Sequence, residues 1–354
     1  MSTKIRIKDI AEKAGVSVGT VDRVLHNRPN VSKKALEKVN KALEEMEYKP
    51  NMYASALAYN KTYTFVMFVP QHNSEAYWQE VEEGANKAEE MHRDFQINLK
   101  YVHYKRFDDE DFERGAEECL NHNPDGVVIV PAGMEITRRL AEHLHTENIP
   151  FVLLDSYMPD LHPLAFFGQD SFSSGYFAAK MLMLIASKEK QIMLMRQTHN
   201  GMLTTKQQAN REVGFRHYML DHYPNIKIVE LNLPLLADKK SYHKALDNFF
   251  IQYPDIHHCI TLNSKAYIIG EYILANNLRN KQAMGYDMVP KNAECLRQGS
   301  ISFIIAQHGY QQGYACVDAL FKAVVLKQQI EIENYMPIEL LTKENCAFYR
   351  RTQM

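Results

Sequence analysis

The sequence predicts an α/β protein built from a small head of three short helices and a body of two lobes, each a doubly wound parallel sheet. Within residues 5–48 three helical patterns follow one another. From Thr64 onward, runs of apolar residues alternate with amphipathic helical patterns, as in parallel sheets that carry helices on both faces. This second part has about 290 residues, more than one hydrophobic core comfortably holds, which predicts two lobes.

Charge separates the same two parts. Residues 1–61 carry 12 Lys and Arg against 7 Asp and Glu, a net charge of +5. The rest of the 354-residue chain carries 29 against 36, a net charge of −7. A compact basic head on an acidic body indicates that only the head contacts a polyanion.

Composition favours a reduced compartment and no membrane anchor. The first 13 residues lack the apolar segment of a secretory signal, and no apolar run is long enough to span a bilayer. Five cysteines, odd in number and far apart, favour free thiols in the cytoplasm over disulfides or a CxxC zinc site. The histidine pairs His143/His145 and His257/His258 lack the partners of a metal site, so we expect no metal and no cofactor.

The first helix of the head is predicted by an apolar stripe that ends at Gly15, because glycine takes the left-handed cap conformation without steric cost. The stripe consists of Ile7, Ile10, Ala11 and Ala14. Ser17 is a suitable N-cap for a second helix, which runs to about Leu25. The side chains expected to point outward from this helix are Val18, Gly19, Asp22 and Arg23.

A third helix follows the break at Asn27-Arg28-Pro29, with Ser32 as its N-cap. Val31 and Leu36 occupy the positions of a hydrophobic staple. The expected buried stripe consists of Ala35, Leu36, Val39, Ala42, Leu43 and Met46. Two helices joined by a tight glycine-containing turn and closed by a third form a helix-turn-helix, whose second helix enters the DNA major groove. A plain three-helix bundle is the alternative, but the basic excess and the small exposed face fall on one module, which favours DNA binding.

The head resembles that of the lac repressor family of bacterial transcription regulators over residues 5–58. The resemblance rests on the pattern A-x-x-A-G-V-S-x-x-T-V-x-R-V, followed by V-S and by Y-x-P-N-x-x-A-x-x-L. It implies that Val18 and Gly19 hold the two variable base-reading positions, that Thr20 holds a phosphate, and that Arg23 reaches a base or a phosphate. The full set of implied DNA-contacting residues is Ser17, Val18, Gly19, Thr20, Arg23, Asn27, Tyr53 and Leu57.

Two positions depart from the family pattern. Gly19 has no side chain, so specificity must depend on Val18, Arg23 and the shape of the DNA. Asp22 stands where relatives usually have Ser. Its carboxylate can accept from a cytosine amino group or pair with a neighbouring basic side chain, and we favour the pair.

Residues 49–61 form the expected linker between head and body. An isolated helix of this length is unstable in water, so a segment that folds only when docked on DNA fits the sequence. By the same resemblance it is the hinge helix, and Leu57 is the wedge that two subunits insert into the minor groove. The alternative is an ordinary spacer with Leu57 packed on the core.

The body alternates strands and helices along its length. The expected strands are FVMFVP, INLKYV, GVVIVP, FVLLD, QIMLM, IKIVEL, HHCITL, AMGYD, ISFIIA and PIELL. Helices are expected at residues 78–92, 111–122, 136–148 and 211–222. Most of the strands are continuous apolar runs, which is typical of parallel strands covered on both faces.

Ligands of doubly wound sheets bind beyond the carboxyl ends of the strands. The polar and aromatic residues expected there are Gln71, His72, Tyr77, Trp78, Asp155, Asp170, Arg196, Arg211, Asn263, Asp287 and Gln307. Carboxylates and amides hold hydroxyl groups and a ring stacks on the apolar face of a sugar, so this set suits a polyhydroxylated ligand. Structural roles compete at three positions: Asp170 as an N-cap, Arg196 as an ion-pair partner and Trp78 as a core residue.

The body also resembles the periplasmic-binding-protein-like effector domain of the same family across residues 62–342, through segments such as FVLLDS, NREVGF and MGYDMVP. This resemblance implies effector contacts from Tyr77, Trp78, Asp155, Arg211, Asn263, Asp287 and Gln307. Among them Arg211 and Asp287 are expected to hold effector hydroxyls. Relatives often have Asn-Asp where this chain has Asn263-Ser264, so one family carboxylate is missing.

The family chain crosses between its lobes three times, here expected near residues 171, 306 and 330. The expected domains are residues 1–48 for the helix-turn-helix, 49–61 for the hinge and 62–354 for the effector-binding body. Lobe 1 then comprises about 62–171 and 306–330, and lobe 2 about 172–305 and 331–354.

The resemblance implies a homodimeric, cytoplasmic transcription regulator that binds a pseudo-palindromic DNA operator under the control of a small-molecule effector. The pocket chemistry favours a carbohydrate, with a nucleobase or an anionic metabolite as alternatives. A sugar-processing enzyme or carrier is the other functional class. The chain has no GxGxxG after a strand, no Walker loop, no HExxH and no GxSxG, so we expect no catalytic residues. The segment after Asn345 shows no heptad pattern, so the tetramer-forming coil of some relatives is not expected.

Overall fold

The computed structural model describes residues 6–25, 29–46, 61–72, 77–203 and 205–349. It divides into two compact units, the head (Met1–Asn60) and the body (Lys61–Met354). The expected hinge residues Tyr53 and Leu57, and Asn27 of the head, lie outside the described residues.

The head contains α1 (Ile7–Ala14), α2 (Val18–Leu25) and α3 (Lys33–Glu45). Gly15 ends α1 with a left-handed φ of 62°. The Thr20 amide donates to Ser17 Oγ at 3.1 Å, and the Ala35 amide donates to Ser32 Oγ at 3.2 Å. These three predicted caps are confirmed, and those at Gly15 and Ser17 set the tight turn that separates α1 from α2.

The three helices bury one small core. Its buried members are Ile10, Ala11, Ala14, Val21, Val24, Val39 and Ala42. Val31 packs against this core, but Leu36 is 42% exposed, so the prediction that Leu36 is buried is wrong. Leu36 lies at the edge of the stripe that Val39 and Ala42 define.

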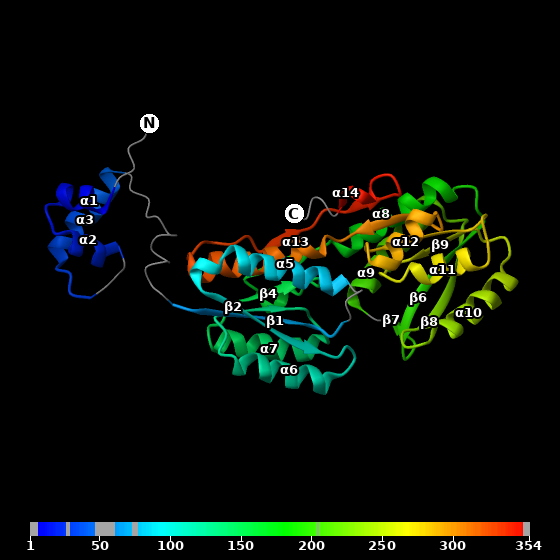
Figure 1. The fold of residues 1–354 in the computed structure, drawn as a ribbon, viewed down its shortest axis with the longest axis horizontal. Coiled ribbons are helices and arrows are strands. Elements are labelled where there is room, and N and C mark those ends of the chain that lie inside the picture. The colour runs from blue at the N-terminus through cyan, green and yellow to red at the C-terminus, as the bar shows by residue number, and fades with distance from the viewer. Residues whose placement is uncertain (1–5, 26–28, 47–60, 73–76, 204, 350–354) are drawn as a thin grey trace. The chain divides into compact units, whose positions relative to one another are not determined.

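Lobe 1 of the body is built on a six-stranded sheet in the order β12-β5-β4-β3-β1-β2, with every pair parallel. The strands are β1 (Tyr63–Pro70), β2 (Ile97–Tyr104), β3 (Gly126–Ile129), β4 (Phe151–Leu154), β5 (Ala165–Gly168) and β12 (Glu333–Tyr335). On one face lie α6 (Asp109–Asn121) and α7 (Met134–Thr146), and on the other α5 (Tyr77–Met91) and α13 (Gly309–Leu320), as Figure 1 shows. A π-helix (Phe321–Val325) continues α13, and 3-10 turns occur at Arg93–Phe95 and Pro159–Leu161.

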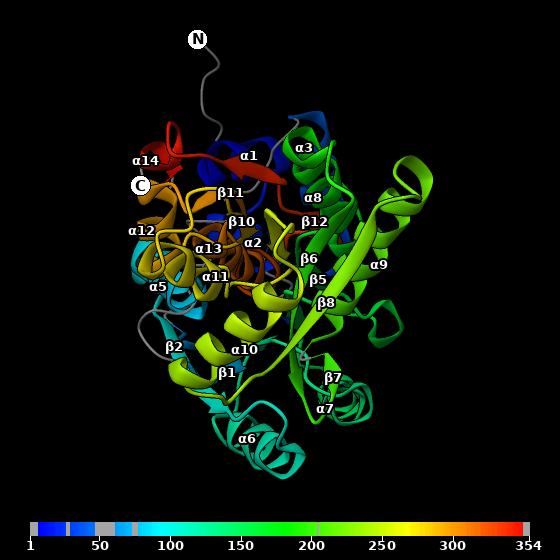
Figure 2. The same ribbon diagram turned by 90° about the vertical axis from the view of Figure 1, so that its right-hand side faces the viewer.

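Lobe 2 is built on a second sheet in the order β13-β11-β10-β9-β6-β7, with β8 also paired to β6. The strands are β6 (Gln191–His199), β7 (Met202–Leu203), β8 (Lys227–Pro234), β9 (His258–Thr261), β10 (Gln282–Tyr286), β11 (Ile301–Ala306) and β13 (Glu339–Leu341). Only β7 and β13 pair antiparallel. In Figure 2, α9 (Lys206–His222) lies to one side of β6 and β8, and α10 (Lys239–Gln252) and α11 (Tyr267–Ala275) lie to the other. α8 (Ser171–Ala186) packs beside α9, while α12 (Pro290–Gln298) packs beside α11 and the short α14 (Cys346–Tyr349) follows β13.

The prediction of an α/β fold with two doubly wound lobes is confirmed. Each of the ten predicted strand segments contains a strand, but β5, β7 and β12 were not predicted. These strands have four, two and three residues, too short for a clear apolar run. All four helices predicted in the body are present. One of them, α9, begins at Lys206, five residues before its predicted start.

The chain passes from one lobe to the other near two of the three expected positions, residues 171 and 306. It leaves the first sheet after β5 and enters the second at β6, and it returns between β11 and α13. The expected crossing near residue 330 is too early, because β12 (Glu333–Tyr335) still pairs with β5 of lobe 1. The third crossing lies between Tyr335 and Glu339, so residues 331–335 belong to lobe 1.

All five cysteines are free, and four of them are buried. Among the described residues, the structure contains no helix that is both long and apolar enough to cross a bilayer.

Candidate functional site

A polar cavity of about 160 Å³ lies where the two lobes meet, and all seven residues expected to contact an effector line it. Asp155 follows β4 in lobe 1, and Asn263, Asp287 and Gln307 follow β9, β10 and β11 in lobe 2. The remaining three come from helices: Tyr77 and Trp78 begin α5, and Arg211 lies in the second turn of α9. The expectation that Arg211 directly follows a strand is therefore wrong, because α9 starts earlier than predicted. The volume is below the 300–1,000 Å³ of pockets for drug-sized ligands and suits a small metabolite.

The two aspartates share an uncommon backbone conformation. Asp155 has φ 71° and Asp287 has φ 66°, both in the left-handed region that non-glycine residues rarely occupy. A backbone hydrogen bond to the neighbouring strand stabilises each conformation. The Asp155 amide donates to the Phe167 carbonyl at 2.9 Å, and the Asp287 amide donates to the Ile305 carbonyl at 3.0 Å. Backbone strain of this kind is common at ligand sites, and here it turns a carboxylate off the end of each strand.

A hydrogen-bonded chain of side chains connects the two carboxylates. Gln307 Nε2 donates to Asp287 Oδ1 at 2.6 Å, and Gln307 Oε1 accepts from the Arg211 guanidinium and from Gln207 Nε2. Gln207 Nε2 also donates to Asp155 Oδ1 at 2.7 Å. Because Gln207 lies on α9 of lobe 2 and Asp155 lies in lobe 1, this bond holds the lobes together at the cavity.

Arg211 is the central cation of the site and is only 2% exposed. Its guanidinium also donates to the Leu262 carbonyl at 3.2 Å and lies 4.1 Å from the centre of the Tyr286 ring, a cation–π contact. Close packing of two helices places it there: a Cβ at Gly175 of α8 would lie 1.9 Å from the Arg211 carbonyl oxygen. Only glycine permits this approach of α8 to α9.

Burial dominates the electrostatics of the cavity. It raises the pKa of Asp287 to about 6, although Arg211 and the bond from Gln307 act in the opposite direction. Burial likewise raises the pKa of Asp155, opposed by Arg106, Arg211 and Gln207. The fold therefore holds two carboxylates in a place that disfavours their charge, which is typical of groups kept for a ligand.

Two buried polar atoms of the cavity make no hydrogen bond within the described part of the chain. They are Tyr77 Oη and Arg211 Nε. Burial and the nearby Asp155 carboxylate raise the pKa of Tyr77 well above its usual value, so its hydroxyl stays protonated. Buried polar atoms are nearly always paired, so these two atoms supply hydrogen-bonding capacity for a ligand.

The aromatic pair is more enclosed than sugar stacking requires. Tyr77 and Trp78 are each 8% exposed and pack edge to face with 5.0 Å between their centroids. The Arg106 guanidinium lies 5.3 Å from the centre of the Trp78 ring. One face of Trp78 is therefore covered by a cation.

Several cavity residues escaped the sequence analysis. The further lining residues are Arg106, Phe107, Gln197, Thr205, Gln207, Gln208, Leu235, Leu262, Ser264 and Lys265. Gln207 and Gln208 follow Thr205, which caps α9 by accepting from the Gln208 amide. That N-cap pattern was the available signal for the earlier start of α9. Phe107 stacks on His199 at 4.6 Å between centroids and adds a second contact between the lobes.

Other polar residues considered at the strand ends have structural roles. Asp170 is the N-cap of α8 and accepts from the Ser173 amide at 2.7 Å, as its structural interpretation predicted. Arg196 forms ion pairs with Glu212 and Glu230. Gln71 and His72 do not line this cavity.

The head presents the predicted face of α2 to solvent. Val18 is 48% exposed, and Gly19 and Arg23 are also exposed. Thr20 Oγ1 lies 2.9 Å from Ser17 Oγ, so these two hydroxyls are held together at the start of α2. Backbone and hydroxyl groups at a helix start are suited to contact DNA phosphates.

A helix-turn-helix head in one chain with a two-lobed body that encloses a polar cavity defines a ligand-responsive DNA-binding regulator. Residues 6–51 match the family described as bacterial regulatory proteins, lacI family, and residues 65–328 match the periplasmic binding protein domain. The chain is 27% identical over 249 residues to the HTH-type transcriptional regulator DegA of Bacillus subtilis, which covers 69% of this chain and 70% of that protein. It is 29% identical over 161 residues to catabolite control protein A of Staphylococcus aureus, covering 45% and 46%.

One solved structure gives the same assignment. A crystal structure from Bacteroides fragilis, assigned to the LacI transcriptional regulators, is 39% identical with a TM-score of 0.79 and covers 82% of this chain and 100% of that one. GanP, a glucose-galactose binding protein from Geobacillus stearothermophilus, is 20% identical with a TM-score of 0.69, covers 81% and 99%, and shows the fold alone. The chain belongs to the LacI family of bacterial transcription regulators.

Proposed function

We propose that this LacI-family regulator works as a cytoplasmic homodimer that binds a pseudo-palindromic operator under the control of a polyhydroxylated effector, a sugar or sugar derivative. The observation that carries the effector proposal is the pair of unpartnered buried atoms, Tyr77 Oη and Arg211 Nε, in a cavity with two carboxylates. A ligand rich in hydroxyl groups can donate to the carboxylates and accept from the phenol and the guanidinium at once. An apolar ligand would leave Tyr77 Oη and Arg211 Nε unpaired.

An anionic sugar derivative is supported by a separate observation. The cavity is lined by the cationic Arg106, Arg211 and Lys265 against the acidic Asp155 and Asp287. The excess of positive charge is suited to a carboxylate or phosphate group on the ligand. A nucleobase effector has weaker support, because Trp78 is largely buried and one face of its ring is covered by Arg106.

Exposed rings on lobe 2 support the dimer. Phe172 on α8 is 42% exposed and packs against His217 of α9 with 5.8 Å between centroids. Other exposed apolar side chains on these two helices are Leu184, Val213 and Leu220. Exposed apolar side chains favour a contact between subunits, and a twofold dimer matches a pseudo-palindromic operator.

Closure of the lobes connects the cavity to the head in this mechanism. The bond between Gln207 and Asp155 and the stack of Phe107 on His199 both join lobe 1 to lobe 2. A ligand that competes for or adds to these contacts changes the relative angle of the lobes. Two paired subunits pass that change to the hinge segments, including the Leu57 wedge, and so alter operator affinity.

Deletion of residues 1–60 is expected to abolish retardation of DNA in a gel while leaving ligand binding intact. The reason is that the exposed α2 face and the basic excess lie in the head, whereas the cavity lies in the body. The full chain first selects operator duplexes from fragmented genomic DNA. A thermal-shift screen of the full chain with neutral sugars, sugar acids, sugar phosphates and nucleobases identifies the effector.

The control for the deletion is that the truncated body shows the same ligand-induced thermal shift as the full chain. Retardation that survives the deletion would contradict DNA binding by the head. A thermal shift with nucleobases alone would contradict the sugar assignment. Turnover of any sugar in the screen would favour the enzyme alternative.

A further inference from the structure

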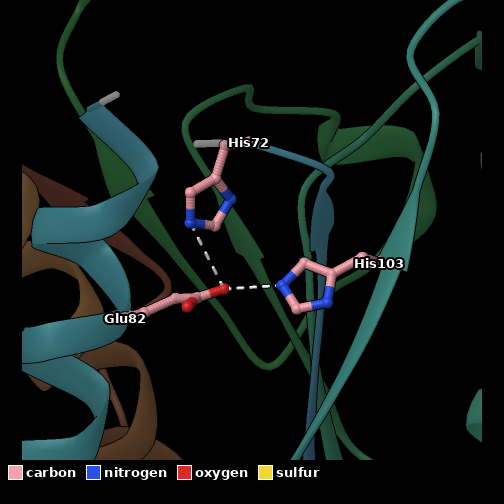
Figure 3. A group of neighbouring side chains, drawn as sticks. All are labelled: His72, Glu82 and His103. Carbon is pink, nitrogen blue, oxygen red and sulfur yellow. Dashed lines mark hydrogen bonds and ion pairs between the residues drawn. The ribbon is translucent and has the colours of Figure 1, made fainter. Parts of the chain in front are cut away.

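Two histidines and a glutamate from three elements converge at the edge of the lobe 1 sheet, as Figure 3 shows. His72 follows the end of β1, Glu82 lies on α5, and His103 lies on the edge strand β2. Glu82 Oε1 is 2.7 Å from His103 Nε2 and 3.6 Å from His72 Nε2. One ligand atom from each residue lies within 4.8 Å of the other two. None of the three lines the effector cavity.

The hydrogen bond at Nδ1 of His72 leaves its Nε2 facing the Glu82 carboxylate. His72 Nδ1 lies 3.0 Å from the Pro70 carbonyl, which can only accept, so Nδ1 carries the proton. In the neutral imidazole, Nε2 then directs a lone pair at the Glu82 carboxylate. The 3.6 Å separation is too long for a hydrogen bond and is close to the distance between two ligand atoms on one metal ion.

We propose that His72 Nε2, Glu82 Oε1 and His103 Nε2 form a binding site for a divalent transition metal, best suited to zinc. Imidazole and carboxylate ligands suit zinc, with bonds of about 2.0–2.2 Å. Ligand atoms of a tetrahedral ion at such distances lie about 3.3 Å apart, between the two separations that the cluster shows. Three protein ligands leave a fourth position for water or a small ligand, as in zinc sites that are not purely structural.

Neighbouring groups orient the ligands as they do in metal sites. The Pro70 carbonyl fixes the tautomer of His72 and leaves Nε2 free to coordinate. The Tyr101 ring stacks on the His103 ring at 6.2 Å with an interplanar angle of 11°, and the Tyr101 hydroxyl donates to Asn86 Oδ1. The His72 side chain is 7% exposed and the His103 side chain 38% exposed, so an ion can enter from the solvent side of His103.

A bound ion would tie α5 to β1 and β2 close to the effector cavity. Glu82 lies four residues after Trp78 on α5, about one helical turn from the aromatic pair that lines the cavity. The ion would therefore fix the first turns of α5 against the sheet. This consequence is independent of which effector the cavity binds.

Calorimetric titration of the chelator-treated, tag-free full chain with zinc chloride tests the site. We expect one ion per chain, and at least tenfold weaker binding in His103→Gln and in Glu82→Gln, because each loses one of three ligands. Substitution with cobalt gives a second readout, since a tetrahedral cobalt site absorbs visible light and the two variants should lose that absorption. His103 is exposed and Gln can replace Glu82 as a hydrogen-bond acceptor, so both variants should fold, which circular dichroism checks.

His143→Gln is the matched control, because His143 is an exposed histidine on α7 of the same lobe. It should bind zinc as the unmodified chain does. Absence of zinc binding in the unmodified chain would overturn the proposal. So would binding that His103→Gln and Glu82→Gln leave unchanged, since the ion would then sit elsewhere.

Discussion

Arg211→Met is expected to abolish the response to the effector while leaving operator binding by the head intact. The substitution removes donors to Gln307 and to the Leu262 carbonyl and the unpartnered Nε that we assign to the ligand. A hydrogen bond from a charged group contributes about 1.5–3 kcal/mol, so the loss of the ligand contact at Nε costs about 2 kcal/mol, roughly thirtyfold in effector affinity. Methionine keeps most of the side-chain volume and avoids a large cavity beside Tyr286.

Calorimetry with the effector and fluorescence anisotropy with labelled operator measure the two parts of this prediction. Arg216→Met on the same helix is the control, because Arg216 is partly exposed and pairs with Glu212 and Glu230 rather than with the cavity. It should bind the effector normally. A normal effector response in Arg211→Met would remove Arg211 from the site.

Asp287→Asn is expected to stabilise the body above pH 6 and to reduce the dependence of its stability on pH between about pH 4 and pH 6. Burial raises the pKa of Asp287 from 3.8 to about 6 in the folded chain. Between these values the folded state binds a proton that the unfolded state has lost, so stability falls as the pH rises through this window. Above pH 6 the buried charge of Asp287 lowers the free energy of unfolding by about 3 kcal/mol. Below pH 3.8 this loss disappears, because the side chain is protonated in both the folded and the unfolded state. Asparagine still accepts from Gln307 Nε2 but carries no charge to desolvate.

Urea unfolding between pH 4.5 and pH 7, followed by the fluorescence of Trp78, measures this effect. Trp78 is the only tryptophan in the sequence and lines the cavity, so its signal reports on the body. Burial also raises the pKa of Asp155, which adds a slope of the same sign that Asp287→Asn leaves in place. Asp170→Asn removes a carboxylate from the N-cap of α8 and should keep the full wild-type slope. A wild-type slope in Asp287→Asn would contradict the placement of a desolvated charge at this position.

Much of the site could be predicted from the sequence, because the residues that follow parallel strands meet at one edge of the sheet, where ligands bind. Asp155, Asn263, Asp287 and Gln307 each follow a strand that its apolar run predicts, so the rule that ligands bind beyond strand ends found them together. Arg211 was placed in the right cavity for the wrong reason, since it reaches the cavity from within α9. Its role and those of the other six residues stay predictions until the effector is known.

The features that the sequence analysis missed depend on contacts between distant segments. Gln207 and Gln208 lie on a helix whose start was predicted five residues late, so their contacts with Asp155 and Asn263, respectively, were not foreseen. The strand β12 has three residues and is defined by its pairing with β5, which no local pattern reveals. The cluster of His72, Glu82 and His103 is brought together by two strands and a helix, and Glu82 and His103 are 21 positions apart in the sequence. Such spacing resembles no metal-binding motif, which is why no metal site was expected.

The most direct test of the central claim is to measure operator affinity with and without saturating effector, and effector affinity with and without saturating operator, at one fixed salt concentration. Effector binding and operator binding are coupled through the relative position of the two lobes. Both affinities should therefore change by the same factor, typically 5–150-fold. The direction of the change identifies the effector as an inducer or a co-repressor. Operator affinity that is the same with the cavity empty and filled would contradict control of DNA binding by the cleft.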